Sequence, residues 1–182
     1  MRKLNMDELN RVSVEEFRQL DKIPVVCVLD NIRSQHNIGS IFRTSDAFRI
    51  MELYLCGITA TPPNREINKS ALGATESVSW QYFSDTCAAI EQLKNEGYTI
   101  IAIEQAIGSQ PLQEFFPEEG RKIALVFGNE VAGVSDDVMQ KVDLCLEIPQ
   151  FGTKHSFNVS VTLGIVLYHI FHAFKNKIQN QV

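Results

Sequence analysis

Six short β-prone runs recur along the chain, and loops with helical patterns separate them. The runs cover residues 25–30, 52–57, 78–83, 99–104, 122–128 and 144–149. Most of them are apolar at consecutive positions, which is typical of strands in a parallel sheet covered by helices. The alternation therefore predicts an α/β fold, in which an open, mostly parallel six-stranded sheet carries helices on both faces.

A short helix is expected ahead of the first strand. Ser13 and Glu16 match the S-x-x-E capping box, and Pro24 follows soon afterwards. No repeat or low-complexity tract divides the rest of the chain. We therefore expect residues 1–22 to be an N-terminal helical extension and residues 23–182 to form one domain.

The composition is that of an ordinary protein with a packed core. Of 182 residues, 45% are hydrophobic and 21% are charged, and no clean apolar run reaches the ~18 residues of a membrane span. The N-terminus lacks the apolar core of a signal peptide. The four cysteines are far apart and form no C-x-x-C pair: Cys27, Cys56, Cys87 and Cys145. We expect a cytoplasmic protein with reduced thiols, no membrane segment and no metal site.

The charges are unevenly distributed. The net charge of −5 argues against a broad nucleic-acid surface. However, the acidic residues are concentrated in residues 76–147, whereas residues 31–75 and 148–182 are each net positive. If the positive segments meet in space, they form a local basic surface on an acidic protein. The alternative is that the helix surfaces simply differ in charge.

Three polar, glycine-bearing loops follow the first, fifth and sixth runs. They cover residues 30–50, 128–137 and 148–161. In an open parallel sheet the carboxyl ends of the strands share one edge, and ligands bind there. The three loops together therefore predict a ligand site at that edge.

Each loop also has a simpler interpretation when it is considered alone. Arg43 either forms a structural ion pair or directs its guanidinium at a phosphate. Gly128 and Gly133 have the spacing of a phosphate-binding loop, but the lysine of that motif is missing, which argues against ATP or GTP hydrolysis. Ser156 is either a helix N-cap or a site residue. The G-x-S-x-G elbow of a serine hydrolase is absent.

Taken in order, the three loops resemble the motifs of the SpoU-TrmH (SPOUT) RNA methyltransferases. NIRSQHNIGSIFRTSDAF (31–48) is similar to motif one, N-x-x-x-x-x-N-x-G-x-x-x-R-x-x-x-A. VFGNEVAGVS (126–135) is similar to motif two, and IPQFGTKHSFNVSV (148–161) to motif three. ALGATESV (71–78) resembles a further segment of some members. The resemblance extends from about residue 24 to about residue 170.

The resemblance implies a fold and an activity. The C-terminal part of the sheet would be threaded into a trefoil knot, and S-adenosylmethionine would bind in that knot. The protein would be a homodimer with its active site at the subunit interface, methylating a ribose 2′-oxygen in a tRNA or rRNA substrate. Residues 23–182 would be the methyltransferase domain, in a compact form without an N-terminal RNA-binding domain. The apolar stripe of the last helix is either part of the dimer surface or core packing: Val159, Leu163, Val166, Leu167 and Ile170.

The resemblance also implies roles for individual residues. The catalytic set comprises Asn37, Arg43, Glu130, Ser156 and Asn158. The methyl donor would be held by Glu104, Gly128, Ile148 and Phe157. Basic side chains near the motifs are candidate RNA contacts: Arg33, His36, Arg49 and Lys154. Three positions depart from the family pattern, since Gln150 replaces Met, Phe157 replaces Leu and Arg49 stands where many members have Gly.

Two other functions remain open for such a chain. One is a non-catalytic RNA-binding or assembly protein that has kept the fold, and failure to bind the donor would favour it. The other is a methyltransferase of the same fold that acts on a base, and a methylated base in the product would establish it.

Overall fold

The computed structural model contains one sheet of seven parallel strands, in the order β3-β2-β1-β6-β4-β7-β5. The structure describes residues 1–5, 7–9, 11–118 and 120–179. The strands are β1 (Ile23–Asp30), β2 (Ile50–Cys56), β3 (Trp80–Phe83), β4 (Thr99–Ile103), β5 (Gln110–Pro111), β6 (Ile123–Phe127) and β7 (Leu144–Glu147). The predicted open parallel α/β sheet is confirmed.

The predicted number of six strands was one too few. The additional strand, β5, consists of Gln110 and Pro111 and pairs with β7 at the edge of the sheet. This strand was missed because a glutamine followed by a proline does not form an apolar run. Proline is tolerated at a sheet edge because its missing N–H needs no partner there.

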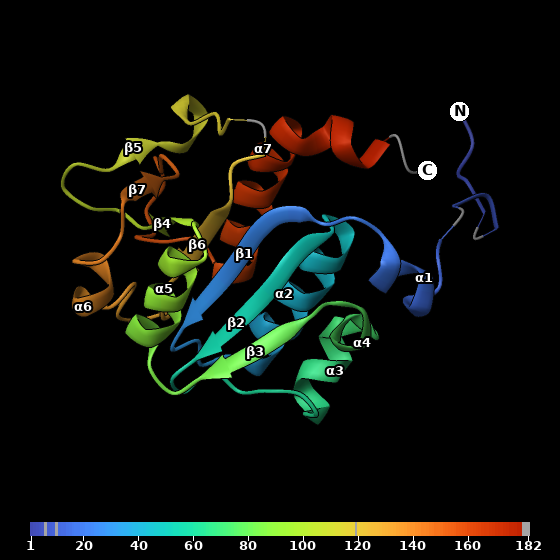
Figure 1. Cartoon of the computed structure of the whole chain (residues 1–182), viewed down its shortest axis with the longest axis horizontal. Coiled ribbons are helices and arrows are strands. Elements are labelled where there is room, and N and C mark those ends of the chain that lie inside the picture. The colour runs from blue at the N-terminus through green and yellow to red at the C-terminus, as the bar shows by residue number, and fades with distance from the viewer. Residues whose placement is uncertain (6, 10, 119, 180–182) are drawn as a thin grey trace.

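Helices cover both faces of the sheet, as predicted (Figure 1). The helices are η1 (Asp7–Leu9), α1 (Val14–Gln19), α2 (Gln35–Ala47), α3 (Arg65–Ala71), α4 (Ala74–Ser77), α5 (Thr86–Asn95), η2 (Leu112–Glu114), α6 (Asp136–Met139) and α7 (Val159–Gln179). One core lies between the sheet and α2, α3, α4 and α7, and a second lies between the sheet and α5 and α6.

The central strand β1 shows why its sequence is apolar throughout. All eight of its residues are buried. Because successive side chains of a strand point to opposite faces, Cys27 and Leu29 enter the first core, whereas Val26 and Val28 enter the second. Both faces of this strand therefore need apolar residues.

The apolar stripe of α7 belongs to the core of this chain. Its five residues are at most 8% exposed and pack in the first core: Val159, Leu163, Val166, Leu167 and Ile170. Other apolar side chains of α7 face outward, since Val161 is 50% exposed and Tyr168 is 62% exposed. The stripe is therefore ordinary core packing, and any dimer surface on α7 uses its other side.

The N-terminal residues form the predicted capped helix. The Ser13 hydroxyl accepts the N–H of Glu16 at 3.2 Å, and the Glu16 carboxylate accepts the N–H of Ser13 at 2.8 Å. The Arg18 guanidinium donates to the carbonyl oxygen of Glu76 at 3.0 Å, which attaches α1 to α4. The division of the chain at residues 22 and 23 stays a prediction, as does the trefoil knot.

The strand order gathers four loops at one edge of the sheet. β1, β6, β4 and β7 are consecutive neighbours and parallel, so the segments that follow them emerge side by side. These segments include the three polar loops singled out in the sequence, together with the short loop after β4.

Replacing Gly39 by alanine is expected to destabilise the protein, because α3 lies directly against this position of α2. A Cβ there would overlap the carbonyl oxygen of Ile67 and the hydroxyl of Ser70. Overpacking of this kind costs about 1–3 kcal/mol, which urea unfolding would measure. Gly164→Ala in α7 is the matched control, because its Cβ would lie 3.9 Å from Thr44 Cγ2, an ordinary contact. Equal unfolding midpoints for the two variants would contradict the close helix contact.

Candidate functional site

Polar groups tie the end of β1 and the loop after it to the loop after β6. The Asp30 side chain is 1% exposed, and its carboxylate accepts the N–H of Ser135 at 2.9 Å and the hydroxyl of Thr86 at 2.6 Å. The Asn129 amide donates to the carbonyl oxygen of Asn31 at 2.7 Å. Motifs one and two are therefore held together by hydrogen bonds that local sequence patterns do not reveal.

Three predicted catalytic residues form one hydrogen-bonded chain. The Asn37 amide donates to the Glu130 carboxylate at 3.1 Å, and the Asn158 amide donates to the Asn37 side-chain oxygen at 3.0 Å. The Glu130 carboxylate also accepts the backbone N–H groups of Arg33 and Ser34, at 2.9 and 3.0 Å. The fold thus joins motifs one, two and three through side chains more than 90 residues apart.

Asn158 also begins helix α7. Its side-chain oxygen accepts the N–H of Ser160 at 2.9 Å and the hydroxyl of Ser160 at 2.7 Å, which is the role of an N-cap. Ser156 precedes the helix by too many residues to be its cap. The capping interpretation of Ser156 is therefore wrong, and this exposed hydroxyl stays available at the site.

The hydrogen bonds around Glu130 lower the pKa of its carboxyl. Partial burial raises this pKa, but the backbone N–H groups of Arg33, Glu130 and Ser34 and the amide of Asn37 together lower it below its ordinary value of 4.5. The carboxylate is therefore ionised at neutral pH and acts as an acceptor for all its donors.

This lowered pKa predicts how stability depends on pH. A carboxyl with a lower pKa in the folded state stabilises the fold above the unfolded value, and this contribution is lost as the pH falls through the folded value. We expect Glu130→Gln to be less stable than the wild type at pH 7 and the difference to shrink below the ordinary pKa of 4.5. Urea unfolding from pH 7 to pH 3 measures this. A difference that does not change with pH would contradict the assignment.

A cavity of about 820 Å³ lies beside this network. All four predicted donor-binding residues line it: Glu104, Gly128, Ile148 and Phe157. Three of the predicted catalytic residues line it as well: Glu130, Ser156 and Asn158. Asn37 is 7% exposed and lies behind Glu130 and Asn158, where it holds their orientation. We call this space the donor cavity.

The walls of the donor cavity are connected by side chains. The Glu104 carboxylate accepts the N–H of Val134 at 3.0 Å and the N–H of Gln105 at 2.9 Å. The Gln105 amide donates to the carbonyl oxygen of His155 at 2.7 Å. The loop after β4 is thereby attached to both motif two and motif three.

Sequence analysis missed Gln105 and Asn129 as site-forming residues. Both are polar and closely follow a buried strand, at the edge where the ligand site was expected. That position was the available indication, but their partners come from distant segments. Asn129 contacts Asn31, and Gln105 contacts His155.

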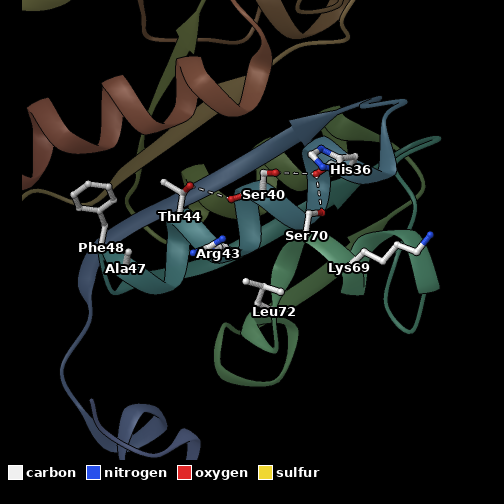
Figure 2. Close-up of a pocket in the computed structure, with 9 residues that line it drawn as sticks. All are labelled: His36, Ser40, Arg43, Thr44, Ala47, Phe48, Lys69, Ser70 and Leu72. Atoms are coloured by element: carbon white, nitrogen blue, oxygen red, sulfur yellow. Dashed lines mark hydrogen bonds between the residues drawn. The ribbon is translucent and has the colours of Figure 1, made fainter. Parts of the chain in front are cut away.

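Arg43 lies in a different cavity (Figure 2). This cavity, of about 670 Å³, is lined by residues of α2 and by Lys69, Ser70 and Leu72 from α3 and its end. Arg43 is exposed and makes no hydrogen bond or ion pair with any residue that the structure describes. The structure therefore does not support a structural ion pair for Arg43, and it does not place this side chain beside the Glu130 network of the same chain.

The four basic candidates do not all lie together. His36 lines the same cavity as Arg43, and Arg33 and Lys154 are exposed in motifs one and three. Arg49 lies in the turn before β2, at the amino edge of the sheet, with a left-handed φ of 50°. Its Nη1 is buried and has no hydrogen-bond partner among the described residues. The structure thus places Arg49 at the opposite edge of the sheet from the predicted ligand site.

Comparison with known proteins identifies the family of this chain. A model of the SpoU rRNA methylase family matches residues 24–168, most of the chain. The chain belongs to this family. The match covers all three motifs and therefore confirms the resemblance that the loops suggested.

Individual relatives agree with this membership. The tRNA (guanosine(18)-2′-O)-methyltransferase of Aquifex aeolicus is 33% identical over 159 residues, covering 85% of this chain and 71% of that protein. The crystal structure of a TrmH/SpoU tRNA modifying enzyme of A. aeolicus has a TM-score of 0.79 and 26% identity, covering 90% of this chain and 83% of that one. The crystal structure of the AdoMet-bound rRNA methyltransferase of Sinorhizobium meliloti has a TM-score of 0.76 and 25% identity. The match covers 84% of this chain and 58% of that one.

Three further observations concern the length of the relatives, membrane-spanning helices and metal ligands. This chain spans 62% of the length of two other curated relatives that it matches. Within the residues that the structure describes, no helix is long and apolar enough to cross a membrane. Those same residues contain no cluster of three or more His, Cys, Asp or Glu that would hold a metal ion.

Proposed function

We propose that this protein transfers a methyl group from S-adenosylmethionine to a ribose 2′-hydroxyl of tRNA or rRNA. The observation that carries the proposal is the hydrogen-bonded chain of Glu130, Asn37 and Asn158 at the wall of the donor cavity. These are the motif residues that the family uses, and here they form one connected site. The relatives named above are tRNA and rRNA methyltransferases, which supports the same substrate class.

The donor cavity suits S-adenosylmethionine. Its volume of about 820 Å³ lies within the range of cofactor pockets. Apolar side chains of Phe127, Ile148 and Phe157 line it, together with the carboxylate of Glu104. This mixture suits a ligand with an aromatic base, polar groups and a positive charge. When bound, S-adenosylmethionine supplies an electrophilic methyl group on a positively charged sulfur.

The residues of this chain would position the ribose and stabilise charge. Holding the attacking oxygen in line contributes much of the rate in such a displacement. Ser156 and Asn158 line the cavity and offer polar groups to the ribose, and Asn37 and Glu130 hold Asn158 in place. Arg43 would bind the target phosphate through its planar fork and stabilise the negative charge that develops on the 2′-oxygen.

The proton of the 2′-hydroxyl must leave the ribose. The guanidinium of Arg43 carries N–H donors and no acceptor, so it cannot accept this proton. A phosphate oxygen or a water molecule would accept it instead. Arg43 therefore acts through its charge and not as a base.

We further propose that the active protein is a homodimer. Arg43 and the donor cavity do not meet within one chain, because Arg43 lines a cavity that shares no residue with the donor cavity. Val161 and Tyr168 expose apolar area on α7, which a second copy would cover. Docking two copies so that Arg43 of one faces the donor cavity of the other would complete the site.

The test uses radiolabelled S-adenosylmethionine, the purified protein and tRNA and rRNA isolated without ribose methylation. After digestion to nucleosides, we expect the label in a 2′-O-methyl nucleoside. Label in a methylated base would establish the base methyltransferase instead. No label and no donor binding would favour the non-catalytic RNA-binding protein.

A further inference from the structure

The cavity that holds Arg43 lies between α2 and the C-terminal end of α3. At Gly39 the helices approach so closely that no side chain fits between them. The hydroxyls of Ser40 and Ser70 both donate to the carbonyl oxygen of His36, each at 3.0 Å, and this fixes the contact (Figure 2). Leu72 follows α3 as its C-cap and has a left-handed φ of 49°. Beyond this contact the cavity opens alongside Arg43.

Two of the side-chain donors that line this cavity, those of Arg43 and Lys69, are cationic. The hydroxyls of Ser40 and Ser70 are used on His36, and the hydroxyl of Thr44 donates to the carbonyl oxygen of Ser40 at 3.0 Å. The other polar side chains of the lining are those of His36, Arg43 and Lys69, and the lining contains no carboxylate. Such a cavity suits an anion that accepts hydrogen bonds from more than one side.

Both strong cations are able to contact a ligand. Arg43 is exposed and makes no ion pair with the described residues. Lys69 pairs with Glu66 at 2.7 Å, but the two side chains are 55% and 53% exposed. Exposed pairs within one helix add little to stability, so a phosphate readily replaces Glu66 as the partner of Lys69. Figure 2 shows Arg43 on α2 and Lys69 on α3, with the Lys69 side chain extended away from Arg43.

We propose that the α2–α3 cavity binds the sugar-phosphate backbone of the RNA beside the methylated nucleotide, with Lys69 as a phosphate contact that the family motifs do not include. This inference rests on the proposed function, because Arg43 must reach the target phosphate for its catalytic role. RNA passing through the cavity then brings a neighbouring phosphodiester to Lys69. A lysine on a phosphate positions the RNA without reading its sequence.

The test compares Lys69→Gln with Lys141→Gln. Lys141 is the matched control, since it also pairs with a glutamate, Glu91, at 2.8 Å, but it lies beyond α6 on the other face of the sheet. The probe is a fluorescein-labelled pool of unmodified tRNA and rRNA fragments, whose binding is measured by anisotropy at several salt concentrations. Methyl transfer to the same pool is measured separately, as are donor affinity and oligomeric state.

We expect Lys69→Gln to weaken RNA binding about three- to tenfold and to reduce the salt slope by roughly 0.7–0.9, as the loss of one phosphate contact does. The donor Kd, the oligomeric state and the methyl-transfer rate at saturating RNA should stay at the wild-type level. Lys69→Arg should restore binding because it keeps the charge. Lys141→Gln should bind RNA like the wild type.

Other outcomes separate the two proposals. If the wild type methylates RNA and Lys69→Gln binds RNA with unchanged affinity and slope, the cavity inference is overturned and the proposed function stands. If Lys69→Gln weakens RNA binding but neither the wild type nor any variant methylates RNA, the proposed function fails, and only the phosphate contact of Lys69 stands, without a methylated nucleotide beside it. If the substitution changes only the oligomeric state, the cavity is a subunit contact and the inference is overturned. An absence of RNA binding by the wild type overturns both.

Discussion

Replacing Arg43 by alanine is expected to lower kcat for methyl transfer by about 10²–10³-fold, the loss found when a charge-stabilising donor is removed. The fold should not change, because Arg43 is exposed and bonds to no residue that the structure describes. The donor Kd should also stay constant, because Arg43 does not line the donor cavity. Single-turnover rates with labelled donor, donor titration and thermal unfolding measure these three quantities.

The variant Arg43→Lys separates the contribution of the planar guanidinium from that of the positive charge. Lysine keeps one positive charge but lacks the planar fork that binds a phosphate through two parallel hydrogen bonds. We therefore expect its kcat to lie well below that of the wild type. Near wild-type turnover in Arg43→Lys would remove the bidentate contact from the mechanism.

The second large effect is expected at Gly128. A Cβ at this position would overlap the backbone of Gly133 and Val134. Because the clash is with backbone atoms, no side-chain rotation relieves it. The paired hydrogen bonds between Asn129 and Gly133, both at 2.9 Å, would then break. Since a displacement of about 1 Å in a site costs ~10²-fold in rate, we expect Gly128→Ala to lower kcat/KM for methyl transfer by roughly that factor and also to weaken donor binding.

Gly152→Ala serves as the control for this substitution. Gly152 also lies in a motif loop, but a Cβ there would meet no atom within 4 Å and its φ is not positive. We expect its thermal unfolding to match the wild type, whereas Gly128→Ala should unfold at a lower temperature. Calorimetry and donor titration check both variants, and wild-type donor affinity in Gly128→Ala would contradict the tight loop.

Much of the fold follows from local patterns. The apolar runs predict six of the seven strands, because a strand covered on both faces must be apolar at consecutive positions. Ser13 and Glu16 predict the start of α1, because both cap bonds form within one turn. The two-residue strand β5 was missed because its pairing depends on the position of β7 and not on its own residues.

The site was predicted in part. The motif resemblance indicated the residues that line the donor cavity, and the structure brings Glu104, Gly128, Ile148 and Phe157 together there. The motif resemblance did not indicate the residues that connect the walls of the cavity, such as Gln105, whose hydrogen-bond partner lies 50 positions away in the chain.

The sequence by itself indicated six of the seven strands, the capped start of α1, the three motif loops and the family. The tertiary structure decided which distant groups meet. Asn37 contacts Glu130 and Asn158 across 93 and 121 positions of chain, Arg43 lies in a separate cavity, and the stripe of α7 is buried. The physical reason is that capping and periodicity act within a few residues, whereas these contacts depend on the order of strands in the sheet. That order places β6 beside β1, although more than 90 residues separate them in the chain.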